Sequence, residues 1–444
     1  MPLISTPTAL LIISMIAGGT ALAGFWYRAR ATTTLTGSTL QLVSTLLATA
    51  LGAWILFGPP EAATWGGVGA IIGYALGVAA PLLLMAIIAP RLFAHSDAGN
   101  GVFGYVSQRY GKSMVYAAAA AIAFYLIISL TAGLTAVAKL VQIFAPIPLA
   151  WTATAVIVAT LAYSLPGGLR VSMFTDRIQA WIAAPLIVAV LFAGFSLIQS
   201  LPAPKVDYAQ FDLTSSTGLQ AGITFFIAVA LTNLFHQGQW QRAETASSNG
   251  QLRRALIISA AIAAPIVLAF GGFGLLFVAT GGAGDPSTAL FNVVTTGSPL
   301  WLSAMLIPLG VLLFMSSADS AITGLTSLTP NPRVGGAVVI ALSLPAAWVA
   351  AQGLSVLYLF LLADLICCAI AFPVFYGLYS RRHSTRAALM ASATGLVAGL
   401  VYFPLPGQPP THLMEAFLAA AVLPVVVCLL MSTLTRDLRE TAAT

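Results

Sequence analysis

Long apolar runs, repeated along the whole chain, are the feature that most limits its possible folds. Hydrophobic residues make up 59% of the 444 residues and charged residues only 7%, against about 25% charged in soluble domains. A helix needs about 20 apolar residues to cross a bilayer, and the sequence offers thirteen such runs. We therefore expect an all-α polytopic membrane protein with helices at approximately 4–27, 38–58, 66–90, 113–143, 149–165, 172–198, 217–240, 255–279, 299–325, 335–351, 353–379, 386–404 and 412–432.

Basic residues predict how these helices are oriented, because cytoplasmic loops of membrane proteins are enriched in Lys and Arg. With the N-terminus outside, sixteen of the eighteen basic residues fall on cytoplasmic segments; Lys139 lies within a helix and Lys205 in an outer loop. The apolar run of residues 3–27 precedes Arg28 and Arg30, the reverse of a cleaved signal peptide, so it should remain as a helix. We expect a bacterial inner (plasma) membrane protein with a cytoplasmic C-terminus.

Residues that could support catalysis are scattered. Cys367, Cys368 and Cys428 lie in apolar runs, and the sequence has no paired-aspartate, serine–histidine or metal-ligand constellation. We expect no enzyme, no cofactor and no nucleic-acid partner. A membrane sensor or receptor is an alternative, which the lack of a polar signalling region in the sequence disfavours.

The stretch 312–327 interrupts an apolar run with oxygen-bearing side chains. Five of them lie within eight residues: Ser316, Ser317, Asp319, Ser320 and Thr323. A carboxylate at bilayer depth costs about 3 kcal/mol on insertion scales, and oxygen ligands can replace the hydration shell of a monovalent cation. The stretch therefore favours a cation site, although hydroxyls that bond back to their own helix are the alternative.

Two predicted helices contain breaks at matching places. Gly52 lies within 38–58, whose outer end should be broken by 58–60 (GPP), and 233–239 (NLFHQGQ) interrupts 217–240. The two helices are five apart in order, as in transporters built from two inverted repeats of five helices. Unwound backbone at membrane depth is tolerated where it lines a cavity; glycine packing between helices is the alternative.

Four motifs, in order along the chain, are similar to those of the sodium/solute symporter family. They are 44–60 (STLLATALGAWILFGPP), 163–179 (YSLPGGLRVSMFTDRIQ), 240–242 (WQR) and 315–320 (MSSADS). The resemblance implies a leucine-transporter-like core, and FHQGQWQR is closer to the proline- and urea-like branch than to the sugar branch. The implied divisions are an extra helix at 1–30, first and second inverted repeats of five core helices each at 38–198 and 217–379, two peripheral helices at 386–432, and a cytoplasmic tail at 433–444.

The resemblance also implies ion sites. A sodium site would use backbone oxygens of Ala48, Leu51 and Leu313 and the hydroxyls of Ser316 and Ser317. A second sodium or coupling site would involve Asp176, Ser317, Asp319 and Ser320. For Asp176, the alternative is a helix N-cap paired with Arg170 or Arg177.

The substrate site is expected at the two helix breaks. Its predicted side chains are Trp54, Phe57, Asn233, His236, Gln237, Gln239, Tyr358 and Asp364. The aromatic pair suits an apolar ring or an alkylammonium group. Asp364 has no basic neighbour in sequence, so it would either pair with Lys139 or recognise a cationic solute.

These observations predict sodium-coupled symport of a small polar organic solute, such as an amino acid, an amine or a urea-like molecule, by alternating access. The expected partners are the solute, Na⁺ and the lipid bilayer, with the monomer as the functional unit. A proton-coupled or uncoupled carrier of the same fold is the alternative. Residues 105–112 should act as a cytoplasmic anchor, and 285–287 should begin a short outer helix that forms part of a lid.

Overall fold

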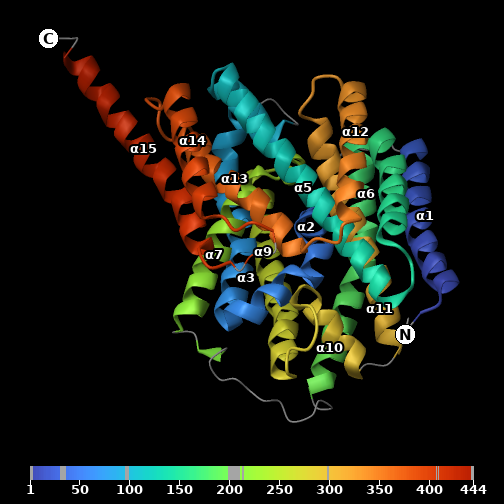
Figure 1. The fold of residues 1–444 in the computed structure, drawn as a ribbon. Coiled ribbons are helices and arrows are strands. Elements are labelled where there is room, and N and C mark those ends of the chain that lie inside the picture. The colour runs from blue at the N-terminus through green and yellow to red at the C-terminus, as the bar shows by residue number, and fades with distance from the viewer. Residues whose placement is uncertain are drawn as a thin grey trace.

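The computed structural model describes residues 4–30, 37–95, 100–198, 211–212, 215–297, 300–406, 408 and 410–441. Over these residues the protein is a bundle of helices without strands, and eleven helices are long and apolar enough to cross a membrane. The chain is therefore a polytopic membrane protein, as predicted (Figure 1). The helices are α1 (Thr6–Arg30), α2 (Thr39–Ala50), α3 (Gly58–Phe93), α4 (Gly101–Arg109), α5 (Lys112–Phe144), α6 (Leu149–Ile198), α7 (Ser216–Thr232), α8 (Gln237–Ala243), α9 (Asn249–Ala279), α10 (Ala289–Gly297), α11 (Leu300–Thr326), α12 (Pro332–Ala350), α13 (Val356–Tyr376), α14 (Thr385–Tyr402) and α15 (Leu413–Thr441).

Over the described residues, eleven long helices correspond to the thirteen predicted ones, and the difference has two causes. Helix α6 contains the predicted fifth and sixth helices, joined at Gly168, whose φ is 58°. The predicted second helix is interrupted, and its helical part, α2, has only 12 residues, so it is too short to count as a span. Helix α3, which corresponds to the predicted third helix, also bends, at Gly67 with φ 56°. A positive φ carries no Cβ penalty at glycine, so each pair of segments stays continuous around a local bend.

The first break lies at Gly52, as the sequence suggested. Helix α2 ends at Ala50, the backbone is extended at Leu51 and Gly52, and the 3-10 turn η1 (Ala53–Leu56) leads into α3. The prediction that residues 58–60 break the outer end is wrong, because these residues begin α3. Proline fits there since the first turn of a helix has no partner for its N–H groups.

The second break separates α7 from α8 through η3 (Asn233–Phe235) and His236. His236 accepts a hydrogen bond from the backbone N–H of Gln239 through Nδ1, so its side chain caps the new helix. A Cβ at Gly238 would collide with the carbonyl of Ser320. Helix α8 therefore lies directly against α11.

Close helix contacts hold the two interrupted segments together. Along α3, Gly69 and Gly73 face Gly218 and Gly222 of α7, and a Cβ at either α3 position would collide with an α7 carbonyl. Small residues at a spacing of four let membrane helices approach closely. Helix α9 packs on α3, helices α5, α6, α11 and α13 lie around the breaks, and α1, α14 and α15 lie at the edges (Figure 1).

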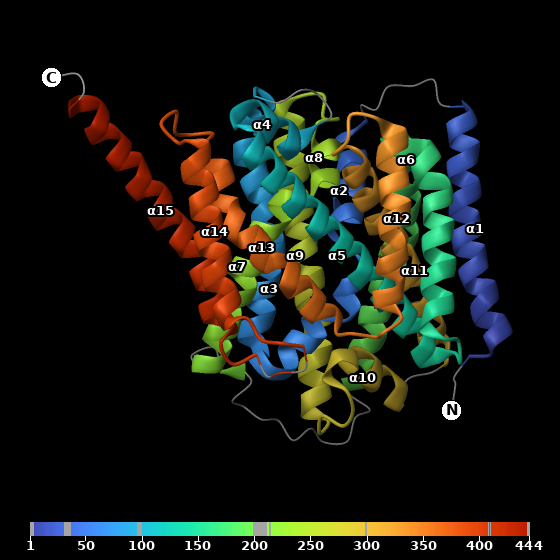
Figure 2. The same cartoon turned by 45° about the horizontal axis from the view of Figure 1, so that its top comes forward.

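The two ends of the bundle differ. Figure 2 shows α4 and α8 at the end where α15 finishes, and α10 at the opposite end near the start of α1. At the α4 end, Arg109 donates hydrogen bonds to the carbonyls of Gly377, Ser380 and His383. These are the contacts of an anchor, as expected for residues 105–112. Lys205 and residues 442–444 of the predicted tail lie outside the described residues.

Candidate ion and solute site

The end of α2 presents free backbone oxygens to α11. Because the helix stops at Ala50, its last carbonyls lose their usual donors four residues on. The carbonyl of Leu47 still accepts from Leu51 N at 2.8 Å, whereas the carbonyl of Ala48 accepts from Ser316 Oγ of α11 at 3.0 Å. The break thus turns a backbone oxygen toward the hydroxyl-rich part of α11.

Further oxygens of α11 gather at the same point. The carbonyl of Leu313 accepts from Ser316 Oγ at 3.2 Å and from Ser317 Oγ at 3.0 Å. Four of the five predicted sodium ligands therefore lie together, and we call Ala48 O, Leu313 O, Ser316 Oγ and Ser317 Oγ the α2–α11 oxygen cluster. Carbonyl and hydroxyl oxygens are ligands that suit a hard monovalent cation. The fifth predicted ligand, Leu51, lies in the extended segment that follows α2. Its carbonyl is therefore not part of a helical hydrogen-bond pattern.

Gly52 permits this close approach of α2 and α11. A Cβ at this position would lie 2.9 Å from Ser317 Oγ and 3.2 Å from Ser317 Cβ. Real Cβ atoms essentially never come so close, so a larger residue would displace Ser317. Next to it, Thr49 Oγ1 and Ser320 Oγ lie 3.0 Å apart and join the two helices again.

At the predicted second ion site, a positively charged side chain of the protein, Arg242, lies between the carboxylates. Asp176 of α6 and Asp319 of α11 are fully buried, and between them lies the fully buried guanidinium of Arg242 from α8. Arg242 Nη2 is 2.8 Å from Asp176 Oδ2 and 3.6 Å from Asp319 Oδ1. Asp176 lies within α6 and pairs with Arg242, so the N-cap paired with Arg170 or Arg177 is wrong.

Hydroxyl groups complete this cluster. Asp319 accepts hydrogen bonds from Ser172 at 2.8 Å, Thr175 at 3.1 Å and Tyr163 at 3.2 Å. The predicted Ser320 directs its hydroxyl mainly to the Ser316 carbonyl at 2.9 Å. Two carboxylates and one guanidinium leave one negative charge, and hydroxyl donors of this kind stabilise a buried anion. The sequence identifies Arg242 only as part of the WQR motif, because nothing local in the chain indicates its distant partners.

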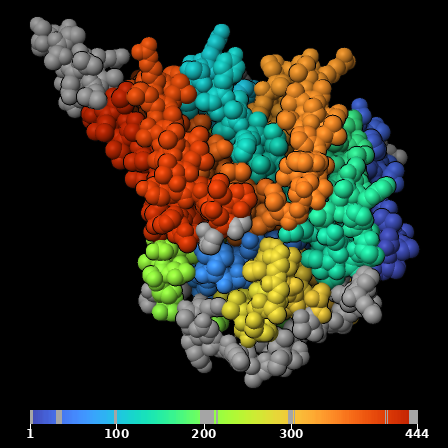
Figure 3. All heavy atoms as spheres, in the orientation of Figure 1, coloured from blue at the N-terminus to red at the C-terminus, as the bar shows by residue number. Residues whose placement is uncertain are grey.

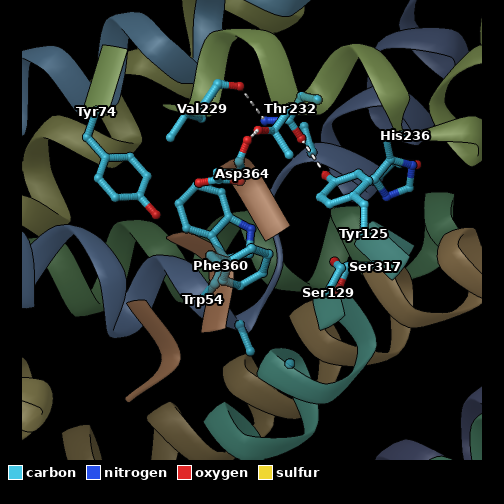
Figure 4. Close-up of a pocket in the computed structure, with 15 residues that line it drawn as sticks. Trp54, Tyr74, Tyr125, Ser129, Val229, Thr232, His236, Ser317, Phe360 and Asp364 are labelled. Atoms are coloured by element: carbon cyan, nitrogen blue, oxygen red, sulfur yellow. Dashed lines mark hydrogen bonds between the residues drawn. The ribbon is translucent and has the colours of Figure 1, made fainter. Parts of the chain in front are cut away.

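A small central cavity lies beside the oxygen cluster (Figure 4). Of the predicted substrate residues, Trp54, Asn233, His236 and Asp364 line it. Its volume of about 30 Å³ has room for water but not for an organic solute. The described structure therefore has its central cavity closed, and Ser317 lines this cavity while it also belongs to the oxygen cluster.

Aromatic side chains surround the carboxylate in this cavity. Trp54 stacks on Tyr74 with ring centroids 5.6 Å apart and meets Phe360 edge-on at 6.2 Å. Asp364 is 5% exposed, and among the described residues no ion pair involves it. Lys139 instead donates to Ser287 Oγ at 3.2 Å, so the proposed pairing of Asp364 with Lys139 is not formed.

The other predicted substrate residues lie elsewhere. Phe57 is buried against Phe291, with ring centroids 4.8 Å apart. Gln237 donates to the Asn100 carbonyl at 2.7 Å and so holds the start of α4. Gln239 lines a smaller neighbouring cavity and donates to the Leu46 carbonyl at 3.4 Å. Tyr358 lines a separate cavity at the α10 end.

Several residues of the central cavity were not predicted. Phe360 could have been found, because it lies one helical turn before Asp364 and shares its face. Tyr74 and Tyr125 come from α3 and α5 and have no local signal in the sequence. Tyr125 donates to Asn233 Oδ1 at 2.9 Å and lies edge-on to His236 at 5.7 Å, which fixes the polar wall of the cavity.

Comparisons with known proteins agree with this architecture. The model of the sodium:solute symporter family matches residues 31–322. A spermidine transporter of Candida albicans is 22% identical over 383 residues, which cover 82% of this chain and 73% of that protein.

Two solved structures are similar in fold. A Na⁺-coupled sialic acid symporter in a substrate-bound outward-open state aligns with a TM-score of 0.72, at 16% identity, over 96% of this chain and 98% of that one. A nucleobase–cation symport transporter, in a closed conformation with bromovinylhydantoin bound, aligns with a TM-score of 0.51, at 14% identity, over 90% of this chain and 93% of that one. Both are transporters, and the likeness extends over nearly the whole chain.

Proposed function

Since the chain belongs to the sodium:solute symporter family, we propose that it moves an organic cation, of the amine or polyamine class, together with Na⁺. The family makes it a solute transporter and not an enzyme. The proposed choice of solute depends on one observation: Asp364 lies in a cavity walled by Trp54, Tyr74 and Phe360 and has no ion pair among the described residues.

The chemistry of this cavity favours an ammonium group. A buried carboxylate is costly unless a cation accompanies it. Faces of Trp and Tyr rings attract cations by a further 0.5–2 kcal/mol or so when water is excluded. An amino acid would bring its own carboxylate next to Asp364, which is unfavourable. The similar spermidine transporter supports the same class of solute.

The α2–α11 oxygen cluster is the proposed sodium site. Its hydroxyl Ser317 also lines the solute cavity, so occupancy of one site alters the geometry of the other. Coupling between two ligands is reciprocal, and each raises the affinity of the other by the same factor. We propose one Na⁺ at this cluster, with Arg242 as the resident cation of the Asp176–Asp319 cluster.

The membrane arrangement follows the basic residues. We propose that the α4 end faces the cytoplasm and the α10 end faces outside, in the inner membrane of a bacterium, with inverted repeats over 38–198 and 217–379 and a functional monomer. The termini at opposite ends of the bundle support an odd number of crossings. Solute would bind from the α10 end and leave at the α4 end.

Uptake into proteoliposomes tests this proposal. Radiolabelled spermidine should accumulate when an inward Na⁺ gradient is imposed and should not accumulate with K⁺ in its place. Asp364→Asn should abolish uptake, whereas Glu415→Gln, a similar change on the half-exposed start of α15, should leave it unchanged. Equal uptake by Asp364→Asn, or preference for a neutral solute, would contradict the proposed solute class.

Proton coupling is the second candidate, favoured by one observation. The Asp176–Asp319–Arg242 cluster carries one uncompensated negative charge, and Asp176 Oδ1 is buried without a hydrogen-bond partner among the described residues. A proton could bind there. Uptake driven by a pH gradient in the absence of Na⁺ would support this candidate over the sodium-coupled one.

A further inference from the structure

A groove with an almost wholly apolar lining lies between four helices, apart from the central cavity. Its volume is about 300 Å³, which is in the range of about 300–1,000 Å³ found for pockets that hold organic molecules. It shares no lining residue with the central cavity or with the cavity at the α10 end. We call it the lateral groove, and its lining comes from residues 47–51 of α2, 179–191 of α6, 262–266 of α9 and 312–316 of α11.

The lateral groove opens on the surface of α6 and α9. Val188 of α6 is 66% exposed and Ile262 of α9 is 40% exposed, and Ala184 of α6 is exposed as well. Figure 3 shows α6 at the edge of the molecule, beside α1. Because α6 and α9 are both long and apolar enough to cross a membrane, the opening of the groove faces the hydrocarbon of the bilayer.

The inner wall of the groove is the back of the α2–α11 oxygen cluster. Ala48, Leu313 and Ser316 line the groove and also supply three of the four oxygens of the cluster. Ser317, which supplies the fourth, lines the central cavity instead. An occupant of the groove therefore packs against the residues that hold the proposed ion ligands, on the side away from the solute.

The chemistry of the lining excludes water and charged solutes as occupants. Thirteen of the fifteen described residues that line the groove are aliphatic, and only Gln179 and Ser316 are polar. The Ser316 hydroxyl already bonds two carbonyls. A buried water needs about three polar partners, and an ammonium ion would lose its hydration without a carboxylate in return. If the groove were empty, its walls would lose their dispersion contacts, so an apolar occupant fits best.

The shape of the groove fits an extended hydrocarbon chain. The lining residues of α6 recur along one face from Gln179 to Leu191, so the groove follows the helix axis for about 18 Å. One leaflet of a bilayer contains about 15 Å of hydrocarbon, half of the apolar core. Lipid chains and membrane-spanning helices both run across the bilayer. A chain can therefore enter the groove sideways, without leaving its leaflet.

We propose that the lateral groove binds one acyl chain of a membrane phospholipid. The small side chains of Ala180, Ala183 and Ala184 leave the space that the chain fills. The bound chain completes the packing behind Ala48 and Leu313. This inference goes beyond the proposed function, because it concerns a lipid and does not depend on the class of the transported solute.

A photoreactive lipid tests the proposal in proteoliposomes that contain the full-length protein. The probe is a phosphatidylglycerol with a diazirine within one acyl chain, and peptide mass spectrometry identifies the labelled residues. The label should reach Leu51 and Leu313, which line the groove but are only 5% and 4% exposed, so that lipid outside the groove cannot touch them. Exposed Val401 of α14 should be labelled in every sample and serves as the reference for lipid around the protein.

Two variants that narrow the opening make the test specific. Ala184→Trp should reduce the labelling of Leu51 and Leu313, relative to Val401, by about tenfold, because the indole fills space that the chain needs. Val188→Trp, at the same opening, should do the same and serves if Ala184→Trp is poorly folded. The matched control is Ala261→Trp, because Ala261 is exposed on α9 without lining the groove; it should leave the labelling unchanged.

Three results would overturn the lipid site. Label at Val188 and Val401 but not at Leu51 or Leu313 would show that lipid passes over the opening without entering. Absence of label from Val188 as well, with Val401 labelled, would show that a second copy of the protein covers the groove. Equal labelling of Leu51 in the wild type and both opening variants would show that the label arrives by another route. Each of these results leaves the proposed transport of an organic cation with Na⁺ unaffected.

Discussion

At the scale of single residues, the shared position of Ser317 carries the link between ion and solute. Its hydroxyl donates to the Leu313 carbonyl at 3.0 Å while the residue lines the central cavity. The Ser317 hydroxyl also donates to the Phe314 carbonyl at 3.1 Å, so both of these bonds stay within α11, whereas the Ser316 hydroxyl reaches the Ala48 carbonyl of α2. Ser317 is therefore the residue where a change should separate ion affinity from folding.

We expect Ser317→Ala to raise the Na⁺ concentration for half-maximal spermidine uptake by about tenfold, since one ligand of about five is lost and a hydrogen-bonding group is worth roughly 1 kcal/mol. Uptake assays over a range of Na⁺ concentrations measure this. The matched control is Ser343→Ala, because the hydroxyl of Ser343 likewise donates to a carbonyl of its own helix, that of Val339, but belongs to α12 and not to the oxygen cluster. The same Na⁺ dependence in both variants would contradict the proposed site.

Arg242 is expected to matter for stability as much as for transport. Arg242→Gln should lower the unfolding temperature strongly, because removal of one partner from a buried ion pair costs about 3–5 kcal/mol. The double variant Arg242→Gln with Asp176→Asn should recover part of the lost unfolding temperature. It removes the carboxylate that Arg242→Gln alone leaves buried without its cation. Thermal unfolding in detergent compares the three proteins, and a double variant less stable than the single one would contradict this account.

At the scale of elements, the two interrupted helices determine the site. Part of this was predictable, because polar and glycine residues inside an apolar run are a local signal from which the breaks at Gly52 and 233–239 follow. The grouping of Ala48 with Ser316 came instead from the resemblance to the sodium/solute symporter family. The exact start of α3 was not predictable, since proline suits either the end of one helix or the start of the next. The partners of Arg242 and Asp364 were also beyond sequence reasoning, because tertiary contacts between distant helices select them.

The close approach of α2 to α11 gives a test at this scale. Gly52→Ala should abolish Na⁺-dependent uptake, because the new Cβ would lie 2.9 Å from Ser317 Oγ and displace that ligand. Gly19→Ala on α1 is the control, since nothing lies within 4 Å of its Cβ position; there alanine should be neutral or slightly stabilising. The rise in unfolding temperature when Na⁺ is added, measured for both variants, compares their Na⁺ binding. A normal Na⁺ shift in Gly52→Ala would mean that the ion binds elsewhere.

At the scale of the whole molecule, the described structure has a closed central cavity of about 30 Å³ and a separate cavity of about 640 Å³ at the α10 end. A solute cannot reach Asp364 without a rearrangement of the helices around it. The hydrogen bonds of Glu61 to Ser355 join α3 to the start of α13 at the α10 end, and those of Arg109 join α4 to the end of α13 at the other. Alternating access requires these two ends to open in turn.

Accessibility of the central cavity should therefore depend on the ligands. A cysteine at Ser129, which lines this cavity on α5, should react slowly with a membrane-impermeant thiol reagent in the closed state. Na⁺ alone should speed the reaction from the α10 side, because it favours the state that accepts solute, and Na⁺ with spermidine should slow it again by filling the cavity. The three natural cysteines are buried, and a cysteine at exposed Ser247 should react at one rate in all conditions. If the rate at Ser129 were equally constant, the cavity would not open and close with its ligands, and Asp364 would have to be excluded as the residue that receives the solute.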